Sequence, residues 1–208
     1  IHSPEGILIN QHHYELNMLF KFGMADCKPI STPLDRNVKL RRYSGKACDL
    51  TWFRQIVKSL IYLTITWPDI SYPVGLITQL CCNPRPNSFS MHKGYCDMSA
   101  AQGHGVAILS KQDEQLVGYT NVDWAGNAHD RRSTSRYAFS LGSAAIVWSS
   151  KKQPTVAPSS AKAKYRGAIV ATCEVIWLKR LLWDLHVEVS DPTTIYCDNL
   201  SSIHLAKN

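Results

Sequence analysis

The chain has 208 residues, 45% of them hydrophobic, which is enough for one large domain or two small ones with a buried core. Its 23 basic and 16 acidic residues give a net charge of +7, which suits a polyanionic partner such as nucleic acid but equally a basic protein without one. Neither a secretion signal nor a run of about 18 apolar residues is present, so we expect an intracellular protein, cytoplasmic or nuclear, without a membrane segment.

The first 84 residues are predicted to be mostly helical. Apolar spacing and capping residues predict one short strand and three helices, at 6–10, 11–22, 51–66 and 68–82. Gly23 closes the first helix and Thr51 caps the second, which is expected to bury Ile61 among its apolar residues. Residues 24–50 are predicted to be a loop, and 85–103 a linker or degenerate segment without helical or strand periodicity.

From residue 104 onward the sequence becomes rich in strands. The expected strands lie at 105–110, 115–122, 137–141, 146–150, 155–156 and 193–197, the first two and the next two as hairpins. A long helix is predicted over 161–186. The apolar residues that keep a helical spacing in it are Tyr165, Ile169, Val175, Ile176, Leu178, Leu181, Leu182 and Leu185. This order predicts an α/β fold with a mixed, five-stranded β-sheet flanked by helices.

Several multi-residue segments follow one another in a characteristic order. They are Lys21-Phe-Gly-Met24, Cys27-Lys-Pro-Ile-Ser-Thr-Pro33, Pro68-Asp-Ile-Ser-Tyr72, Asp123-Trp-Ala-Gly126, Asp130-Arg-Arg-Ser-Thr-Ser135, Trp148-Ser-Ser-Lys-Lys-Gln-Pro154 and Tyr196-Cys-Asp-Asn199. Together they resemble the copia-type retrotransposon Pol polyproteins, where reverse transcriptase runs into ribonuclease H. The resemblance implies the C-terminal end of reverse transcriptase, a small helical connection segment, over 1–84. It implies a ribonuclease-H-like domain, truncated at its C-terminus, over 104–208.

The resemblance also implies partners and a cofactor. The family's activities are RNA-directed DNA polymerase and ribonuclease H, so the expected ligand is an RNA–DNA hybrid. Upstream reverse transcriptase and integrase parts of the polyprotein are the other expected partners. Ribonuclease H cuts RNA with two Mg²⁺ ions about 3.5–4 Å apart. Because Mg²⁺ prefers oxygen ligands, such a site needs several carboxylates close together.

Two acidic residues match the metal ligands of that family. Asp123 stands in the family's Asp-Trp segment and Asp198 in its Cys-Asp-Asn segment, so both are the predicted catalytic and metal-binding residues. A turn aspartate and a helix cap remain their alternative roles. The residue two positions before Asp123, which is often a second acid in the family, is Asn121.

The start of the long helix departs most from the family. The family's Ser-Ser-Thr-Glu-Ala-Glu-Tyr reads Ser159-Ser-Ala-Lys-Ala-Lys-Tyr165 here, so Lys164 stands at the position of the catalytic Glu and Lys162 at that of a neighbouring acid. A lysine in the first turn of a helix costs about 0.3–1 kcal/mol, and its ammonium group repels a metal ion. The sequence therefore predicts an inactive ribonuclease site. Exchanges of this kind, Glu→Lys and Asp→Asn, also suggest the hypothesis of a silenced element that decayed by cytosine deamination.

Two other functions stay open. The first is a non-catalytic module that binds nucleic acid through basic and aromatic side chains, namely Arg131, Arg132, Trp148, Lys151 and Lys152. The second is a weak Mg²⁺-dependent ribonuclease H in which Asp130 or Glu174 substitutes for the missing acid.

Overall fold

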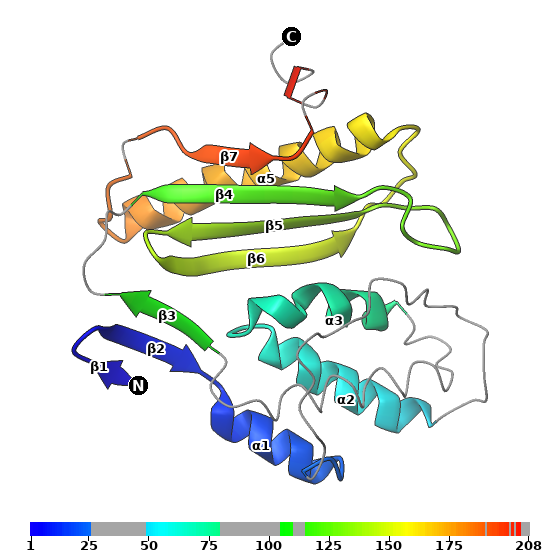
Figure 1. Ribbon diagram of the computed structural model, residues 1–208, viewed down its shortest axis with the longest axis vertical. Helices are drawn as coiled ribbons and strands as arrows, with labels where there is room; N and C mark the ends of the chain where they lie inside the picture. The colour runs from blue at the N-terminus through cyan, green and yellow to red at the C-terminus, as the bar shows by residue number, and fades with distance from the viewer. Residues whose placement is uncertain are drawn as a thin grey trace. The chain divides into compact units, whose positions relative to one another are not determined.

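The computed structural model of the chain describes residues 1–25, 49–79, 105–109, 115–189, 191–199, 201, 203 and 204. Its helices and strands are β1 (His2–Ser3), β2 (Gly6–Asn10), α1 (His12–Lys21), α2 (Leu50–Leu63), η1 (Pro68–Ile70), α3 (Ser71–Thr78), β3 (Gly105–Leu109), β4 (Leu116–Asp123), β5 (Thr134–Leu141), β6 (Ala144–Lys152), α5 (Ser160–Asp184) and β7 (Thr194–Cys197) (Figure 1). The predicted linker at 85–103 and most of the predicted loop at 24–50 lie outside the described residues.

The chain divides into two compact units. The first comprises Ile1–Ser3 and Ile7–Val106, and the second comprises Pro4–Gly6 and Ala107–Asn208. Both contain helices and strands, so the chain is of mixed α/β class, as the sequence predicts. The proposed boundaries at residues 84 and 104 stay predictions. No helix within the described ranges is both long and apolar enough to cross a membrane.

The helices of the first unit follow their sequence signals with two corrections. α1 ends where predicted, because Gly23 adopts a left-handed backbone with φ of 68° just after the helix. The cap of α2 is Asp49 and not Thr51, since the Asp49 carboxylate accepts hydrogen bonds from the backbone N–H groups of Thr51 and Trp52 at 2.8 and 3.4 Å. Pro68 starts only a short 3₁₀ turn, η1, and α3 follows it; Cys82, the predicted end of that helix, lies outside the described residues.

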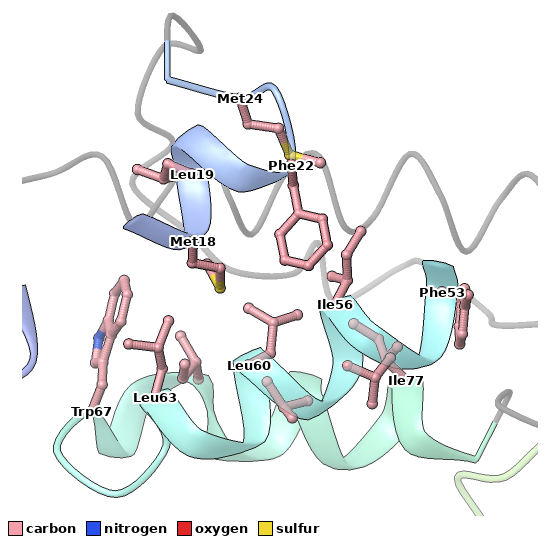
Figure 2. Close-up of a cluster of buried hydrophobic side chains, with 13 residues drawn as sticks. Met18, Leu19, Phe22, Met24, Phe53, Ile56, Leu60, Leu63, Trp67 and Ile77 are labelled. Atoms are coloured by element: carbon pink, nitrogen blue, oxygen red, sulfur yellow. The ribbon is translucent and has the colours of Figure 1, made fainter. Parts of the chain in front are cut away.

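α2 is the centre of the core of the first unit. Figure 2 shows Met18 of α1 and Phe22, the residue that follows this helix, pointing toward α2, where Ile56 and Leu60 are fully buried. Ile61 is exposed, contrary to expectation, because it lies one residue beyond Leu60 and hence about 100° further around the helix axis. The buried side chains of this core come from the segment that contains α1, α2 and α3, and the second unit has a separate core of its own.

The strands form two sheets, and the first predicted hairpin is wrong. β3 belongs to a three-stranded sheet of order β1-β2-β3, whereas β4 lies in a four-stranded sheet of order β6-β5-β4-β7. Both edges of β4 are taken by β5 and β7, so no edge is left for β3 to pair with. The second predicted hairpin is confirmed as β5 and β6. Within the described part of the chain this sheet has four strands and not five, and residues 155–156 are not a strand.

The four-stranded sheet is mixed because β7 returns parallel to β4. β5 is antiparallel to β4 and to β6, while β7 pairs with β4 in parallel from Val117↔Thr194 to Thr120↔Cys197. Parallel neighbours require a crossover connection, and α5 supplies it along one side of the sheet (Figure 1). The C-terminal ends of β4 and β7 therefore lie at the same edge of the sheet.

α5 packs on the sheet through a line of small and then larger side chains. Its buried residues are Ala163, Gly167, Ala171, Val175, Leu178 and Leu182. A Cβ at Gly167 would lie 2.4 Å from Val122 Cγ2, so only glycine permits this approach of helix to strand. Of the apolar residues that keep the helical spacing, Ile169, Ile176, Leu181 and Leu185 are exposed. Because α5 lies close to the sheet, small side chains of the helix face the sheet and several large ones are exposed.

Candidate functional site

The predicted site residues come from the ends of β4 and β7. Side chains of β4 alternate, so that Thr120 and Val122 face α5 while Asn121 and Asp123 face the opposite side of the sheet. Thr120 pairs with Cys197, the last residue of β7, and Asp198 follows Cys197 directly. On β4, Asn121 follows Thr120, and Asp123 lies two residues further along.

Lys164 forms an ion pair with Asp198. Its Nζ lies 2.6 Å from Asp198 Oδ2, with the lysine side chain 17% exposed and the aspartate 53% exposed. The two residues are 34 positions apart in the sequence and meet because α5 begins at the edge where β7 ends. Two of the three predicted catalytic residues, Lys164 and Asp198, are therefore in contact, with the ammonium group of the lysine against the carboxylate of the aspartate.

Only one of the two lysines lies in the first turn of α5. Ser159 is the N-cap, and its side chain accepts a hydrogen bond from the backbone N–H of Lys162 at 3.2 Å. No acidic residue lies in this turn, where the exposed Lys162 faces the partial positive charge of the helix end. Lys164 is the fifth residue of the helix and lies beyond the first turn, where it pairs with the Asp198 carboxylate.

Asp123 is the last residue of β4, and its side chain lies over the turn that follows. Its carboxylate occupies the space where a Cβ of Gly126 would be, so a larger residue at position 126 would have to displace it. The same turn is tied down by Trp124, whose Nε1 donates to the carbonyl of Ala157, and by Ala125, whose backbone N–H donates to Ser133 Oγ. The alternative role of Asp123, as a turn aspartate, stays a prediction.

The described residues do not suit a magnesium site. No three His, Cys, Asp or Glu side chains in the described ranges come together as a group that could hold a metal ion. The acid best placed for the task, Asp198, already faces an ammonium group. A divalent cation needs several oxygen ligands and no neighbouring positive charge. The expected Mg²⁺ therefore does not fit the described residues.

The first proposed substitute acid, Asp130, belongs to a different ion pair. Lys152 Nζ donates to its Oδ2 at 2.8 Å, and the backbone N–H of Arg132 donates to its Oδ1 at 3.1 Å. Burial would raise the pKa of Asp130, but the hydrogen bonds from Lys152 and Arg132 and their positive charges together hold it below its usual value. Asp130 is therefore an ionised anchor of its own turn.

The second proposed substitute, Glu174, lies against Tyr137. Burial raises the pKa of the Tyr137 hydroxyl, and the charge and hydrogen bond of Glu174 raise it further, against an opposing hydrogen bond with Ser149. Glu174 follows Lys164 by ten residues, which is about 15 Å along the helix axis. It is thus remote from the start of α5 where the ion pair lies.

The predicted nucleic-acid residues do not form one patch. Lys151 and Lys152 are neighbours on β6 and point to opposite sides of the sheet. Lys152 and Arg132 are held by Asp130, Arg131 is exposed, and Trp148 is half-buried opposite Ala138.

The sequence reasoning missed Tyr119 and Tyr196. Their rings stack at 5.3 Å on the sheet face opposite α5, and 53% and 56% of these residues is exposed. The available signal in the sequence was an aromatic residue at a solvent-facing position of each of two strands, β4 and β7.

Comparisons with known proteins place the chain among long polyproteins. It is 36% identical over 207 residues to the retrovirus-related Pol polyprotein from transposon RE2 of Arabidopsis thaliana and 37% identical to that from transposon RE1; each match covers 99% of this chain. The chain spans about one seventh of these relatives, 14% of their length. An uncharacterized mitochondrial protein of the same plant is 36% identical over 175 residues, 84% of this chain and 73% of that protein. No family model and no solved structure matches.

Proposed function

The chain belongs to the copia-type family of retrotransposon Pol polyproteins, and on that premise we propose that it is a remnant of the reverse transcriptase and ribonuclease H region whose ribonuclease site no longer cuts RNA. Two observations support the assignment to ribonuclease H. The sheet order β6-β5-β4-β7, with three antiparallel strands and a parallel fourth, agrees with the mixed sheet that the resemblance implies. α5 is the crossover helix that such a sheet requires.

The loss of activity rests on the Lys164–Asp198 ion pair at 2.6 Å. A metal ion bound by Asp198 would lie within a few ångströms of the ammonium group. Two unit charges of like sign 4 Å apart repel by about 4 kcal/mol at an effective dielectric constant of 20, and a divalent ion doubles this. Asn121, which follows the β4 residue that pairs with Cys197, adds no compensating negative charge.

A cleavage assay on an RNA–DNA hybrid tests the proposal. The chain is compared with the double variant Lys162→Glu, Lys164→Glu, and both are also made with an extension past Asn208 taken from a relative. We expect no Mg²⁺-dependent cleavage by the chain in either form. The matched control is Lys179→Glu, which exchanges a lysine of the same helix whose Nζ donates to the carbonyl of Asp191. Cleavage by the unaltered chain that requires Mg²⁺ and is lost in Asp198→Asn would overturn the proposal.

The stacked pair Tyr119 and Tyr196 favours nucleic-acid binding as a second candidate function. Exposed aromatic rings on a sheet stack on bases, and each such contact is worth about 1–3 kcal/mol. The net charge of +7 would draw a polyanion to the chain.

This candidate is tested by the affinity for a hybrid and for single-stranded RNA at several salt concentrations. Binding should weaken with salt, and Tyr119→Ala should lower affinity on the order of 10- to 100-fold. Tyr62→Ala, at a tyrosine of α2 that is 50% exposed, should leave it unchanged. Equal effects of the two variants, or no binding at low salt, would exclude this function.

A further inference from the structure

Gln153 lies at the junction between the sheet and the start of α5. It follows β6 directly and is only 5% exposed. Its Nε2 donates one hydrogen bond to Ser135 Oγ on β5 and another to the backbone carbonyl of Ala163 on α5, each at 2.9 Å. An amide nitrogen has two N–H donors, so one donor of Gln153 is used on the sheet and the other on the helix.

The orientation of this amide follows from its partners. The carbonyl of Ala163 can only accept a hydrogen bond, so the nitrogen and not the oxygen of the Gln153 side chain must face it. In an α-helix the same carbonyl also accepts the backbone N–H four residues later, here that of Gly167. The bond from Gln153 is therefore additional to those that the helix makes by itself, and it joins the helix to the sheet.

The surroundings of the first turns of α5 differ from those of the rest of the helix. Beside a small apolar cluster, they include the buried polar side chains of Thr120, Ser135 and Gln153. Further along, the buried residues that pack together are all apolar: Leu116, Phe139, Ala171, Val175, Leu178 and Leu182. Apolar burial has no preferred direction, whereas a hydrogen bond requires a set distance and angle. Hydrogen bonds thus fix where the helix begins more narrowly than apolar contact alone.

The oxygen of the same amide does not stabilise the fold. Among the described residues, Gln153 Oε1 is buried without a hydrogen-bond partner. An unpaired buried acceptor costs free energy, which offsets part of what the two bonds of the nitrogen contribute. A side chain of similar length without this oxygen, such as methionine, would fill the same space, so packing alone does not explain glutamine at this position. The two bonds of Nε2 do.

We propose that Gln153 is a positioning residue, which holds the start of α5 on the sheet so that the side chain at position 164 meets Asp198. Ala163 directly precedes Lys164, whose Nζ lies 2.6 Å from Asp198 Oδ2. An anchor one residue away limits how far the backbone of Lys164 can move. Position 164 is that of the family's catalytic acid, so this role rests on the proposed function. Its test needs no catalysis, and the two can therefore fail separately.

Cross-linking with a carbodiimide, which adds no spacer, tests the position of Lys164. The reagent activates a carboxylate, and an amine in contact with it forms an amide bond. Mass spectrometry of the digested full chain compares Lys164 joined to Asp198 with Lys152 joined to Asp130, and the native chain should give both products. In Gln153→Met we expect the first product to fall about tenfold, because a misplacement of about 1 Å strongly slows a reaction between two held groups. The second should stay unchanged, since the backbone hydrogen bond of residue 153 remains.

Two further variants complete the test. Ser135→Ala removes one of the two acceptors and should lower the first product by a smaller factor, which also decides the matter should Gln153→Met not fold. Gln79→Met is the matched control and should change neither product, because the Gln79 side chain bonds the Gly75 carbonyl within its own helical segment. Equal loss of both products in Gln153→Met, or no loss of the first in it and in Ser135→Ala, overturns the proposal. Either result means that the amide does not position Lys164.

Discussion

Among the described residues of the second unit, two Lys–Asp ion pairs differ in how firmly the fold holds them. Asp130 and Lys152 meet at 2.8 Å with 35% and 22% of their side chains exposed, and Asp130 also accepts the backbone N–H of Arg132. Asp198 and Lys164 meet at 2.6 Å, but Asp198 is 53% exposed. The first pair joins the turn at Asp130 to the end of β6, whereas the second joins α5 to the exposed residue after β7. Substitution at the second site can thus alter its chemistry without unfolding the protein.

Removal of the turn acid should have the largest effect on stability. Asp130→Ala deletes the acceptor of the Arg132 N–H and leaves the ammonium group of Lys152 partly buried without its acid. We expect the free energy of unfolding to fall by about 1–3 kcal/mol. Urea denaturation followed by circular dichroism measures this change. A loss no greater than that of Asp198→Asn would remove the distinction between the two pairs.

Reversal of charge at Lys164 should create a response to metal ions. Lys164→Glu places a second carboxylate beside Asp198, so we expect Mg²⁺ to raise the melting temperature of this variant and not that of the native chain. At a Mg²⁺ concentration ten times the dissociation constant, the gain is about 1.4 kcal/mol. Differential scanning calorimetry with and without Mg²⁺ provides the measurement, with Lys179→Glu as control. The same rise in the native chain would contradict the idea that Lys164 blocks the site.

The dependence of stability on pH should distinguish the turn pair. The folded state lowers the pKa of Asp130, so this group contributes stability above its unfolded pKa, which is about 3.9. That contribution is lost as the pH falls through the lower pKa of the folded state. The stability difference between the native chain and Asp130→Asn should therefore shrink below about pH 4. A difference that stays constant from pH 6 to pH 3 would show that ionisation of Asp130 is not responsible.

Neutralisation of Asp198 should have the smallest effect. Exposed ion pairs contribute about 0–1 kcal/mol, and Asp198 is more than half exposed. Asp198→Asn should consequently change the free energy of unfolding by less than about 1 kcal/mol. Thermal denaturation at low and high salt checks this value, and any loss should decrease at high salt. A loss above about 2 kcal/mol would mean that this pair, too, holds the fold.

The sequence predicted the local elements well and their partners less well. Gly23 indicated where α1 ends and Pro68 where a helical turn begins, and strand signals indicated β5 and β6. These signals act over a few neighbouring residues, so the sequence alone contains them. The cap of α2 was misplaced by two residues, since Asp49 and Thr51 are both good caps and only the folded backbone selects one. The spacing of apolar residues predicted α5 but not which of its side chains face the sheet, because the close approach of helix to strand favoured Gly167 and its small neighbours.

The sequence by itself determined the family of the chain, the order of most of its strands and helices, and the exchange of an expected acid for Lys164. Only the tertiary structure decided that β7 and not β3 lies beside β4, and that Lys164 meets Asp198. The physical reason is the same in both cases. Both contacts join residues that are far apart in the sequence. Which of them meet depends on how the crossover helix α5 packs on the sheet, and local sequence signals do not specify this packing.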